Sequence, residues 1–298
     1  MKSGPKPIAL YILLLISMAL WGASFVWGKI ALESYSAFTV IFFRLFVSVI
    51  VLLPVLLISK NFKLPSKENL HLFILLAFFE PFLYFIGETN GLKYIGASMT
   101  SIIISVIPLF TPFVAYYFLK EKVSFVNLMG IIISISGIMF LVFDKNMNLQ
   151  VPINGLILLL LSVVAANGYS VMIKKMPLDH SVLNIIFWQS LFGFLMFLPI
   201  VAIFDFKAIK TTGFAYDSII AILKLGIFAS TIAFLFYMYA LRYMPITKVN
   251  VFSNTIPIFT IIIAWFAMGE VLDAKRLIGM LIVILGVVVS QLKYKIFK

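Results

Sequence analysis

The feature that most constrains this chain is a series of long apolar segments that recurs along its whole length. A helix needs roughly 20 apolar residues to cross about 30 Å of hydrocarbon. Ten such segments can be marked, at residues 8–27, 36–58, 70–87, 97–119, 124–143, 153–173, 181–204, 218–240, 247–268 and 277–292. Each must be helical, because lipid offers no partner to backbone N–H and C=O groups. The sequence therefore predicts an all-α polytopic membrane protein with ten transmembrane helices.

The composition excludes several other classes of protein. Apolar residues make up 63% of the chain and charged residues only 11%, against roughly 45–50% and about 25% in soluble domains. The chain has no cysteine, which removes disulfides and thiolate chemistry. Its two histidines, His71 and His180, are far apart, so we expect no metal site and no cofactor. The net charge of +12 does not indicate nucleic acid, since in a membrane protein the position of the charges matters more than their sum.

The lysines and arginines predict how the chain lies in the membrane. An even number of spans puts both termini on one side, and that side receives more basic residues than the other, among them Lys60, Lys63 and Lys174. The excess predicts that both termini lie on the cytoplasmic side of the membrane. We expect this membrane to be a bacterial inner membrane. A cleaved signal peptide is the alternative for the first span, because Ser17-Met18-Ala19 resembles a cleavage site.

An internal duplication divides the chain into two halves. Residues 92–141 align without a gap with residues 241–290, at an offset of 149. The matched pairs include Leu92 with Leu241, Pro108 with Pro257, Thr111 with Thr260, Glu121 with Glu270, Gly130 with Gly279 and Gly137 with Gly286. Earlier in each half the offset is 145, which pairs Lys29 with Lys174, Pro54 with Pro199 and Arg44 with Gln189. We therefore expect two repeats of five helices, at residues 1–149 and 150–298.

Five is an odd number, so the second repeat must cross the membrane in the opposite direction to the first. Inverted repeats of this kind are typical of secondary transporters, in which one half rocks against the other around a central site. A duplication retained only for folding is the alternative.

The chain resembles the EamA branch of the drug/metabolite transporter superfamily over nearly its whole length. The residues that carry the resemblance are Trp21-Gly22-x-Ser24-Phe25 with Lys29, Phe43-Arg44, Pro108 with Glu121, and Gly130 with Gly137, together with their partners in the second half. The resemblance implies a ten-helix exporter or importer of small metabolites that uses no ATP. The chain departs from the symmetry of this pattern at Ala166-Asn167, which stands where Trp21-Gly22 does in the first half.

Glu80 is the most unusual polar residue inside a predicted span. Polar groups at membrane depth usually face a cavity or a partner helix. Glu80 shares a helix face with Tyr84, and Pro81 loosens the backbone beside it. The carboxyl group is a candidate for binding a proton or a cationic group of a substrate, and a fixed ion pair with Arg44 is the alternative. We expect Glu88 to lie nearer the surface and to be solvated.

Two matched polar stripes follow the fourth and ninth spans. Spacings of three and four residues put each set on one helix face. The stripes are Ser98, Ser101, Ser105 and Pro108, and Thr247, Asn250, Asn254 and Pro257. They predict a shared central cavity, with hydrogen bonding between helices as the alternative.

A third set of candidates consists of aromatic residues that carry a polar group. They are Trp21, Tyr84, Tyr237 and Tyr239, and they are joined by Asn167 on the helix that the repeat matches with the first helix. The predicted substrate-binding residues are Trp21, Ser24, Glu80, Tyr84, Ser101, Ser105, Asn167, Tyr237, Asn250 and Asn254, and Glu80 and Arg44 are the candidates for ion coupling. We assign structural roles to Pro108 and Pro257 as helix breaks, to Glu121 and Glu270 as helix caps, and to Gly130 and Gly279 as close-packing positions.

These observations favour a secondary transporter for a small organic solute, possessing no enzymatic activity. No phosphate-binding Gly-Lys-Ser/Thr loop is present, so we expect ion or substrate gradients to drive it. An intramembrane lipid-modifying enzyme and a passive channel are the alternatives. The expected partners are the solute and the lipid bilayer, with no nucleic acid, and the chain is either a monomer or a homodimer.

Overall fold

The first repeat of the computed structural model consists of helices that follow the predicted spans. The model describes residues 7–119, 125–143, 146, 148–177, 179–244, 249, 252–270 and 273–291. The elements of the first repeat are α1 (Pro7–Ala31), α2 (Ala37–Ile58), α3 (Leu70–Ala77), the π-helical turn η1 (Phe78–Leu83), α4 (Tyr84–Ile95), α5 (Ala97–Ile104), α6 (Ile107–Leu119) and α7 (Phe125–Val142). The third span is longer than the sequence predicted, because α3, η1 and α4 run on to Ile95.

The second repeat follows a similar order, with η2 (Val201–Asp205) and α10 (Phe206–Thr212) added after its second long helix. Its elements are α8 (Ile153–Lys175), α9 (Val182–Ile200), η2, α10, α11 (Tyr216–Lys224), η3 (Leu225–Ala233), α12 (Phe234–Tyr243), η4 (Phe252–Thr255), α14 (Ile256–Met268) and α15 (Ala274–Gln291). Within the described residues, the sole β-type contact is an isolated bridge between Phe143 and Leu149. The prediction of an all-helical chain is confirmed.

Seven helical stretches of the described chain are long and apolar enough to cross a membrane. They are Pro7–Ala31, Ala37–Ile58, Leu70–Ile95, Ala97–Phe118, Ile153–Lys175, Val182–Thr212 and Tyr216–Tyr243. Leu128–Val142 and Phe252–Met268 are shorter apolar helices. The chain is thus a multi-pass membrane protein by length and composition, and the number of ten crossings stays a prediction.

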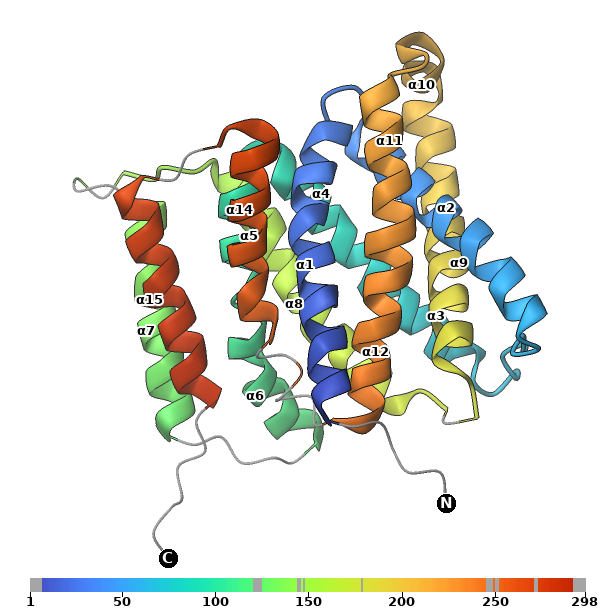
Figure 1. The fold of residues 1–298 in the computed structure, drawn as a ribbon, viewed down its shortest axis with the longest axis horizontal. Helices are drawn as coiled ribbons and strands as arrows, with labels where there is room; N and C mark the ends of the chain where they lie inside the picture. The colour runs from blue at the N-terminus through green and yellow to red at the C-terminus, as the bar shows by residue number, and fades with distance from the viewer. Residues whose placement is uncertain are drawn as a thin grey trace, which may run out of the picture.

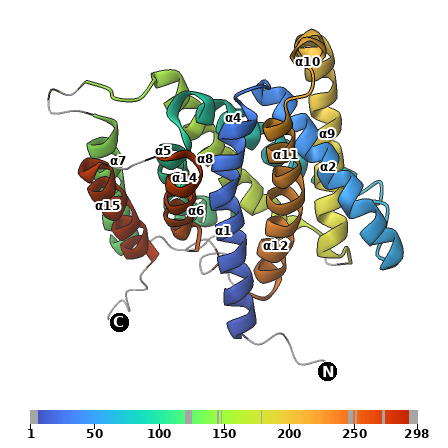
Figure 2. The same ribbon diagram turned by 45° about the horizontal axis from the view of Figure 1, so that its top comes forward.

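The helices lie side by side in a row of pairs (Figures 1 and 2). α7 packs along α15 at one end of the row and α2 packs along α9 at the other. α1, α4, α8 and α12 lie between them and enclose the centre. The start of α1 and the end of α15 lie at the lower face in Figure 1, whereas α8 begins near the upper face.

Close helix pairs hold the two repeats together. A Cβ atom on Gly286 of α15 would lie 2.7 Å from the carbonyl oxygen of Gly130 on α7, and one on Gly279 would lie 2.4 Å from Cγ of Leu141. Only glycine allows these backbones to approach so closely. The positions predicted to pack closely therefore do so between repeats.

Breaks in the helices surround the centre of the molecule. At Glu80 the backbone is extended (φ −147°, ψ 118°), and the following Pro81 has no N–H group to donate. The third span of the second repeat contains the corresponding π-helical segment η3. The chain also leaves regular α-helix just before Pro108, between α5 and α6, and just before Pro257, which lies at the start of α14. These interruptions turn side chains and carbonyl groups toward the interior.

The helix-capping role expected of Glu270 is filled by another residue. The side chain of Asp273 accepts a hydrogen bond of 2.7 Å from the N–H of Arg276 in the first turn of α15. Glu121, which the repeat matches with Glu270, lies outside the described residues.

Candidate functional site

A central cavity lies where the broken helices of both repeats meet. Its volume is about 80 Å³, which is enough for several water molecules. It is lined by Trp21, Ser24, Phe25, Arg44, Glu80, Tyr84, Phe85, Glu88, Ile104, Ile107, Ala166, Tyr169, Ser170, Phe234, Tyr237, Ser253 and Ile256. Five of the predicted substrate-binding residues are therefore together in one place, namely Trp21, Ser24, Glu80, Tyr84 and Tyr237, and Arg44 joins them.

Arg44 is held by a hydrogen bond and a ring, with no carboxylate close enough for an ion pair. Its Nε donates to Oγ of Ser230 at 3.0 Å, and its guanidinium carbon lies 4.0 Å from the centre of the Phe85 ring. Among the described residues, neither Glu80 nor Glu88 is within 4.0 Å of its nitrogens. The fixed ion pair between Arg44 and Glu80, which the sequence left open, is absent from this conformation.

The two carboxyl groups of the cavity differ in their partners. Glu80 is 8% exposed and makes no hydrogen bond with any described residue, whereas Glu88 is 5% exposed and accepts a 2.9 Å bond from Oγ1 of Thr89. The expectation that Glu88 is solvated at the surface is wrong, because α4 turns this residue inward toward the same cavity. Burying ionised carboxylates is costly unless a cation, a proton or hydrogen-bond donors compensate them.

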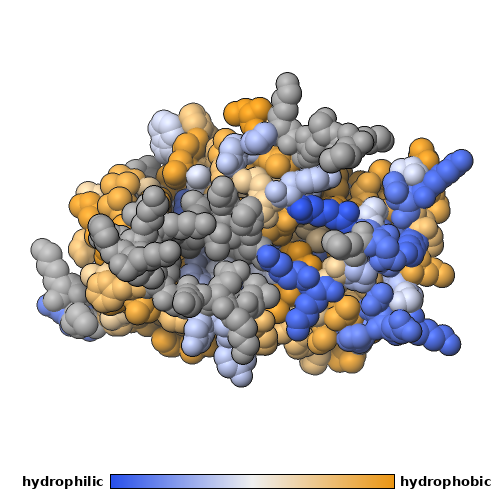
Figure 3. Space-filling model, turned by 90° about the horizontal axis from the view of Figure 1, so that it is seen from below, coloured by the Kyte–Doolittle hydropathy of each residue, from blue (hydrophilic) through white to orange (hydrophobic). Residues whose placement is uncertain are grey.

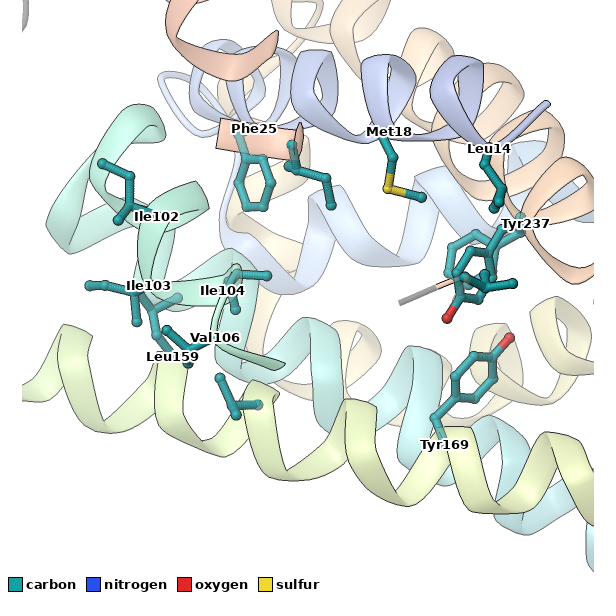
Figure 4. Packing of buried hydrophobic residues seen from close by; sticks show 14 of the residues in the cluster. Leu14, Met18, Phe25, Ile102, Ile103, Ile104, Val106, Leu159, Tyr169 and Tyr237 are labelled. Carbon is teal, nitrogen blue, oxygen red and sulfur yellow. The ribbon is translucent and has the colours of Figure 1, made fainter. Parts of the chain in front are cut away.

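Aromatic rings form the opposite wall of the cavity. The Trp21 ring lies 5.1 Å from the ring of Phe234 and 4.9 Å from that of Tyr237, and Nε1 of Trp21 donates to the carbonyl of Ala229 at 3.3 Å. The hydroxyl group of Tyr169 donates to Oε1 of Gln189 at 3.1 Å. Figure 4 shows the hydroxyl groups of Tyr169 and Tyr237 turned toward each other from α8 and α12. The cavity therefore combines flat apolar walls with a few polar groups.

The predicted polar stripe on the fourth span does not reach the cavity. The hydroxyl groups of Ser101 and Ser105 donate to the carbonyls of Ser98 and Ile102 in their own helix, both at 2.7 Å. Ile104 and Ile107 face the cavity from this span instead. For these serines the structure favours the alternative of local hydrogen bonding.

Two of the predicted amides, Asn167 and Asn254, do not line the cavity. Asn167 is buried, donates to the carbonyls of Ile107 and Val163, and accepts from Oγ1 of Thr111. Asn254 is buried beside the cavity, and its side chain makes no hydrogen bond with the described residues. Asn250 lies outside the described residues. Tyr239 lies beside Tyr243, with ring centres 5.1 Å apart, and does not line the cavity.

Several cavity residues were missed, and the internal repeat contains the signal that finds them. At the offset of 145, the lining residues Trp21, Ser24 and Phe25 correspond to Ala166, Tyr169 and Ser170, which also line the cavity. At the offset of 149, Ile104, Ile107, Phe85 and Glu88 correspond to Ser253, Ile256, Phe234 and Tyr237. A search for the repeat partners of the candidates would therefore have identified Tyr169, which is the partner of Ser24.

The described residues contain no group of three histidine, aspartate or glutamate side chains that is close enough to hold a metal ion. The cavity offers an arginine, two carboxyl groups, hydroxyl groups and aromatic rings as groups for molecular recognition.

Comparison with known proteins decides the family. The sequence model of the EamA-like transporter family matches residues 8–143 and, a second time, residues 153–291. This chain belongs to the EamA-like transporter family. The two matches confirm that the chain contains two EamA repeats, and the family is one of membrane transporters.

Relatives from bacteria and archaea have the same kind of name. The chain is 26% identical over 298 residues to "Uncharacterized transporter YetK" of Bacillus subtilis (strain 168), covering 97% of this chain and 89% of that protein. It is 26% identical to "Uncharacterized transporter YcxC" of the same organism, covering 95% and 92% of the two chains. It is 27% identical to an "Uncharacterized transporter" of Archaeoglobus fulgidus, covering 95% and 97%.

A solved structure has the same fold. A crystal structure described as "Crystal structure of protein" superposes on this chain with a TM-score of 0.72. The superposition covers 96% of this chain and 97% of the other chain. The two sequences are 13% identical, so this likeness concerns the fold alone.

Proposed function

We propose that this EamA-family protein is a secondary active transporter that exports a small organic solute across the bacterial inner membrane. The solute is an amino acid or an amphipathic, drug-like molecule, and both termini of the transporter lie in the cytoplasm. The observation that carries the proposal is the central cavity, in which Arg44, Glu80 and Glu88 face aromatic rings from both repeats. Family membership supports transport, and the chemistry of the cavity supports this class of solute.

Each wall of the cavity matches one part of such a solute. A guanidinium group binds carboxylates well, so Arg44 is suited to an acidic group of the solute. Glu80 and Glu88 are suited to an amine, and the rings of Trp21 and Phe234 to an apolar side chain. Binding all three parts at once distinguishes an amphipathic solute from water and inorganic ions.

Glu80 is the proposed site of proton coupling. It makes no hydrogen bond with a described residue and lies at the backbone break of the third span, where a small movement changes its surroundings. A carboxyl group buried this way stays neutral by holding a proton, or ionised by holding the amine of the solute. Competition between proton and solute for Glu80 couples their movement in opposite directions.

Alternating access follows from the small size of the cavity and from the two repeats. About 80 Å³ does not hold an amino acid together with its water, so the surrounding helices must separate to admit one. We propose that the repeats lie in the membrane in opposite orientations, and that rocking of one against the other opens the cavity to each face in turn.

The test is solute-driven proton movement in proteoliposomes containing an entrapped pH indicator. Amino acids, amines and sugars are added one at a time, and the response should saturate with solute concentration. Glu80→Gln should abolish the pH response while the protein retains its melting temperature. Glu270→Gln, which changes a carboxyl group far from the cavity, is the matched control.

Two results would contradict the proposal. A normal pH response by Glu80→Gln would remove this residue from coupling. Flux that rises linearly with solute concentration would indicate a passive channel, because a transporter saturates once its sites are occupied.

A further inference from the structure

A second cavity of about 330 Å³ lies near the lower face of the molecule, where α8 and α12 end and α9 begins. Its apolar wall includes Met176, Val182, Ile185, Met238 and Leu241. It has no assigned role, and it is several times larger than the central cavity. Figure 3 views the lower face, where hydrophilic side chains gather on the side of α2, α3 and α9.

This second cavity continues the line of the central one along the same two helices. On α8, Tyr169 lines the central cavity and Ile173, one turn further along, lines the second cavity. On α12, Tyr237 lines the central cavity and Leu241 lines the second. The two tyrosines therefore lie at the boundary between the cavities (Figure 4).

The second cavity is basic. Lys174 and Arg242 line it, and Arg242 also donates a hydrogen bond to the backbone carbonyl of His180. The nearby acidic group, Asp179, is already paired with Lys63. Among the described residues, the charge that faces the cavity is thus positive.

The internal repeat gives this cavity a counterpart position at the opposite face, where the equivalent helices α1 and α4 touch. Lys174 and Leu241 correspond to Lys29 and Leu92. At the counterpart, a Cβ atom on Gly28 would lie 2.8 Å from Cδ2 of Leu92, so α1 and α4 are in direct contact. Nζ of Lys29 lies 3.5 Å from the carbonyl oxygen of Lys93.

The two equivalent crossings are therefore in different states. α8 and α12 leave a cavity between their ends, whereas α1 and α4 touch at Gly28 and Leu92. The cavity of about 420 Å³ at the opposite face lies instead between α1, α11 and the end of α14. In a molecule built from two like halves, such a difference defines one of two conformations, and exchanging the roles of the halves gives the other.

We propose that the second cavity is the open vestibule of the transport pathway, and that Lys174 and Arg242 bind the anionic group of the solute there before it reaches Arg44. In the other conformation, the region at Lys29 and Lys93 opens and becomes the matching vestibule at the opposite face. This inference rests on the proposed function, because it assumes that the central cavity binds the transported solute.

The absence of cysteine from the chain makes a direct test available. Leu241→Cys puts one thiol in the vestibule of the full-length protein, and its rates of reaction with an anionic and a cationic methanethiosulfonate reagent are measured at low salt. The anionic reagent should be favoured relative to a free thiol in solution. Lys174→Gln should lower the ratio of anionic to cationic rates by about five-fold, since one charge several ångströms away acts on both reagents in opposite senses.

Two controls make the result specific. Lys175→Gln removes a neighbouring lysine that does not line the cavity, and it should leave the ratio nearly unchanged. Leu92→Cys, at the counterpart position where α1 and α4 touch, should react far more slowly than Leu241→Cys. If Leu241→Cys does not fold, Ile173→Cys provides a second thiol in the same wall.

The proposal is overturned if Lys174→Gln and Lys175→Gln have equal effects, or if the thiols at residues 92 and 241 react at equal rates. The thiol reaction needs no transport, so its outcome is independent of the pH response of Glu80→Gln. A basic vestibule without proton movement would leave this inference standing and remove the proposed coupling, and the reverse result would do the opposite.

Discussion

The two repeats build the same walls around the central cavity but fill them with different chemistry. The first repeat provides Arg44, Glu80 and Glu88. The corresponding residues of the second repeat are Gln189, Ala229 and Tyr237, of which Tyr237 lines the cavity. All the charge thus comes from one half. The other half replaces it with an amide that holds Tyr169, a backbone carbonyl that accepts from Trp21, and a phenol.

This difference indicates a division of labour between halves that share one scaffold. The repeat determines many of the positions that face the cavity, because the breaks before the prolines are common to both halves. The residue types at those positions then decide what the cavity binds. We expect substitutions at charged positions to change transport with little effect on folding, and substitutions where the repeats cross to change folding first.

The contacts between helices of different repeats show the same contrast. Gly22 of α1 packs on α14, where Oγ1 of Thr260 donates to its carbonyl at 3.1 Å. At the equivalent crossing Asn167 of α8 meets α6, and Oγ1 of Thr111 donates to its side chain at 3.2 Å. One crossing depends on the absence of a side chain and the other on an amide.

The largest expected effect is therefore that of Gly22→Asn, which gives the first crossing the residue of the second. A Cβ atom there would lie 2.7 Å from Cβ of Phe259 and 3.0 Å from the backbone nitrogen of Thr260. We expect a loss of at least about 3 kcal/mol of stability, and hence little folded protein. The measurement is the yield and the melting curve of the detergent-purified protein.

The reverse exchange, Asn167→Gly, is the matched comparison. It removes hydrogen bonds without creating a clash, and in membranes such bonds contribute little, so the expected loss is about 1 kcal/mol. Equal losses at the two crossings would show that close packing does not distinguish them.

The second prediction is that Arg44→Gln, which gives the first repeat the amide of the second, lowers solute-driven proton flux at least about ten-fold, or roughly 1.4 kcal/mol. It removes the single cation that lines the central cavity among the described residues. The fold should persist. Arg276→Gln, at a half-exposed arginine that pairs with Asp273, is the control. Normal flux in the Arg44 variant would mean that charge in the first repeat is not used for binding.

These cases show how far the sequence alone could go. Apolar length was sufficient to predict the helices. Polar and aromatic residue types inside the spans were sufficient to predict Trp21, Glu80, Tyr84 and Tyr237 as cavity residues. They failed for Ser101 and Ser105, because a hydroxyl group on a helix can satisfy itself on the carbonyl of its own preceding turn. They failed for Glu88, because depth was judged from distance along a straight helix. Glu88 lies four residues beyond Tyr84, on the same helix face, and that face lines the cavity.

The third prediction concerns two joints between α2 and α9, one near each face. Oγ1 of Thr39 donates to Asp205 at 3.0 Å. At the equivalent joint Asn184 accepts from the N–H of Lys63 and donates to its carbonyl, at 3.1 Å and 2.8 Å. Asn184→Ala breaks more bonds than Thr39→Ala, so we expect losses of about 2 and about 1 kcal/mol respectively. Thermal unfolding of both variants measures the difference, and an equal loss would mean that the joints contribute alike.

The smallest expected effect is a dependence of stability on pH at the Asn184 joint. Burial lowers the pKa of His180 below its usual value. Nδ1 of His180 lies 2.7 Å from Nδ2 of Asn184, and since the amide nitrogen can only donate, Nδ1 must be unprotonated. The folded protein therefore binds this proton less readily than the unfolded chain does. The contribution of the neutral ring is complete above the unfolded pKa of about 6.5, and it is lost as the pH falls below that value.

A second group titrates at the same joint, but in a lower range. The hydrogen bond from Lys63 lowers the pKa of Asp179, so the stability that this pair contributes is present above the unfolded pKa, near 3.8, and is lost only in more acidic solution. Melting temperatures between pH 7 and pH 5 therefore isolate His180. The wild-type melting temperature should fall over this interval, and the fall should be smaller in His180→Gln but unchanged in His71→Gln, which alters an exposed histidine. An equal fall in all three proteins would show that the acid sensitivity arises elsewhere than at His180.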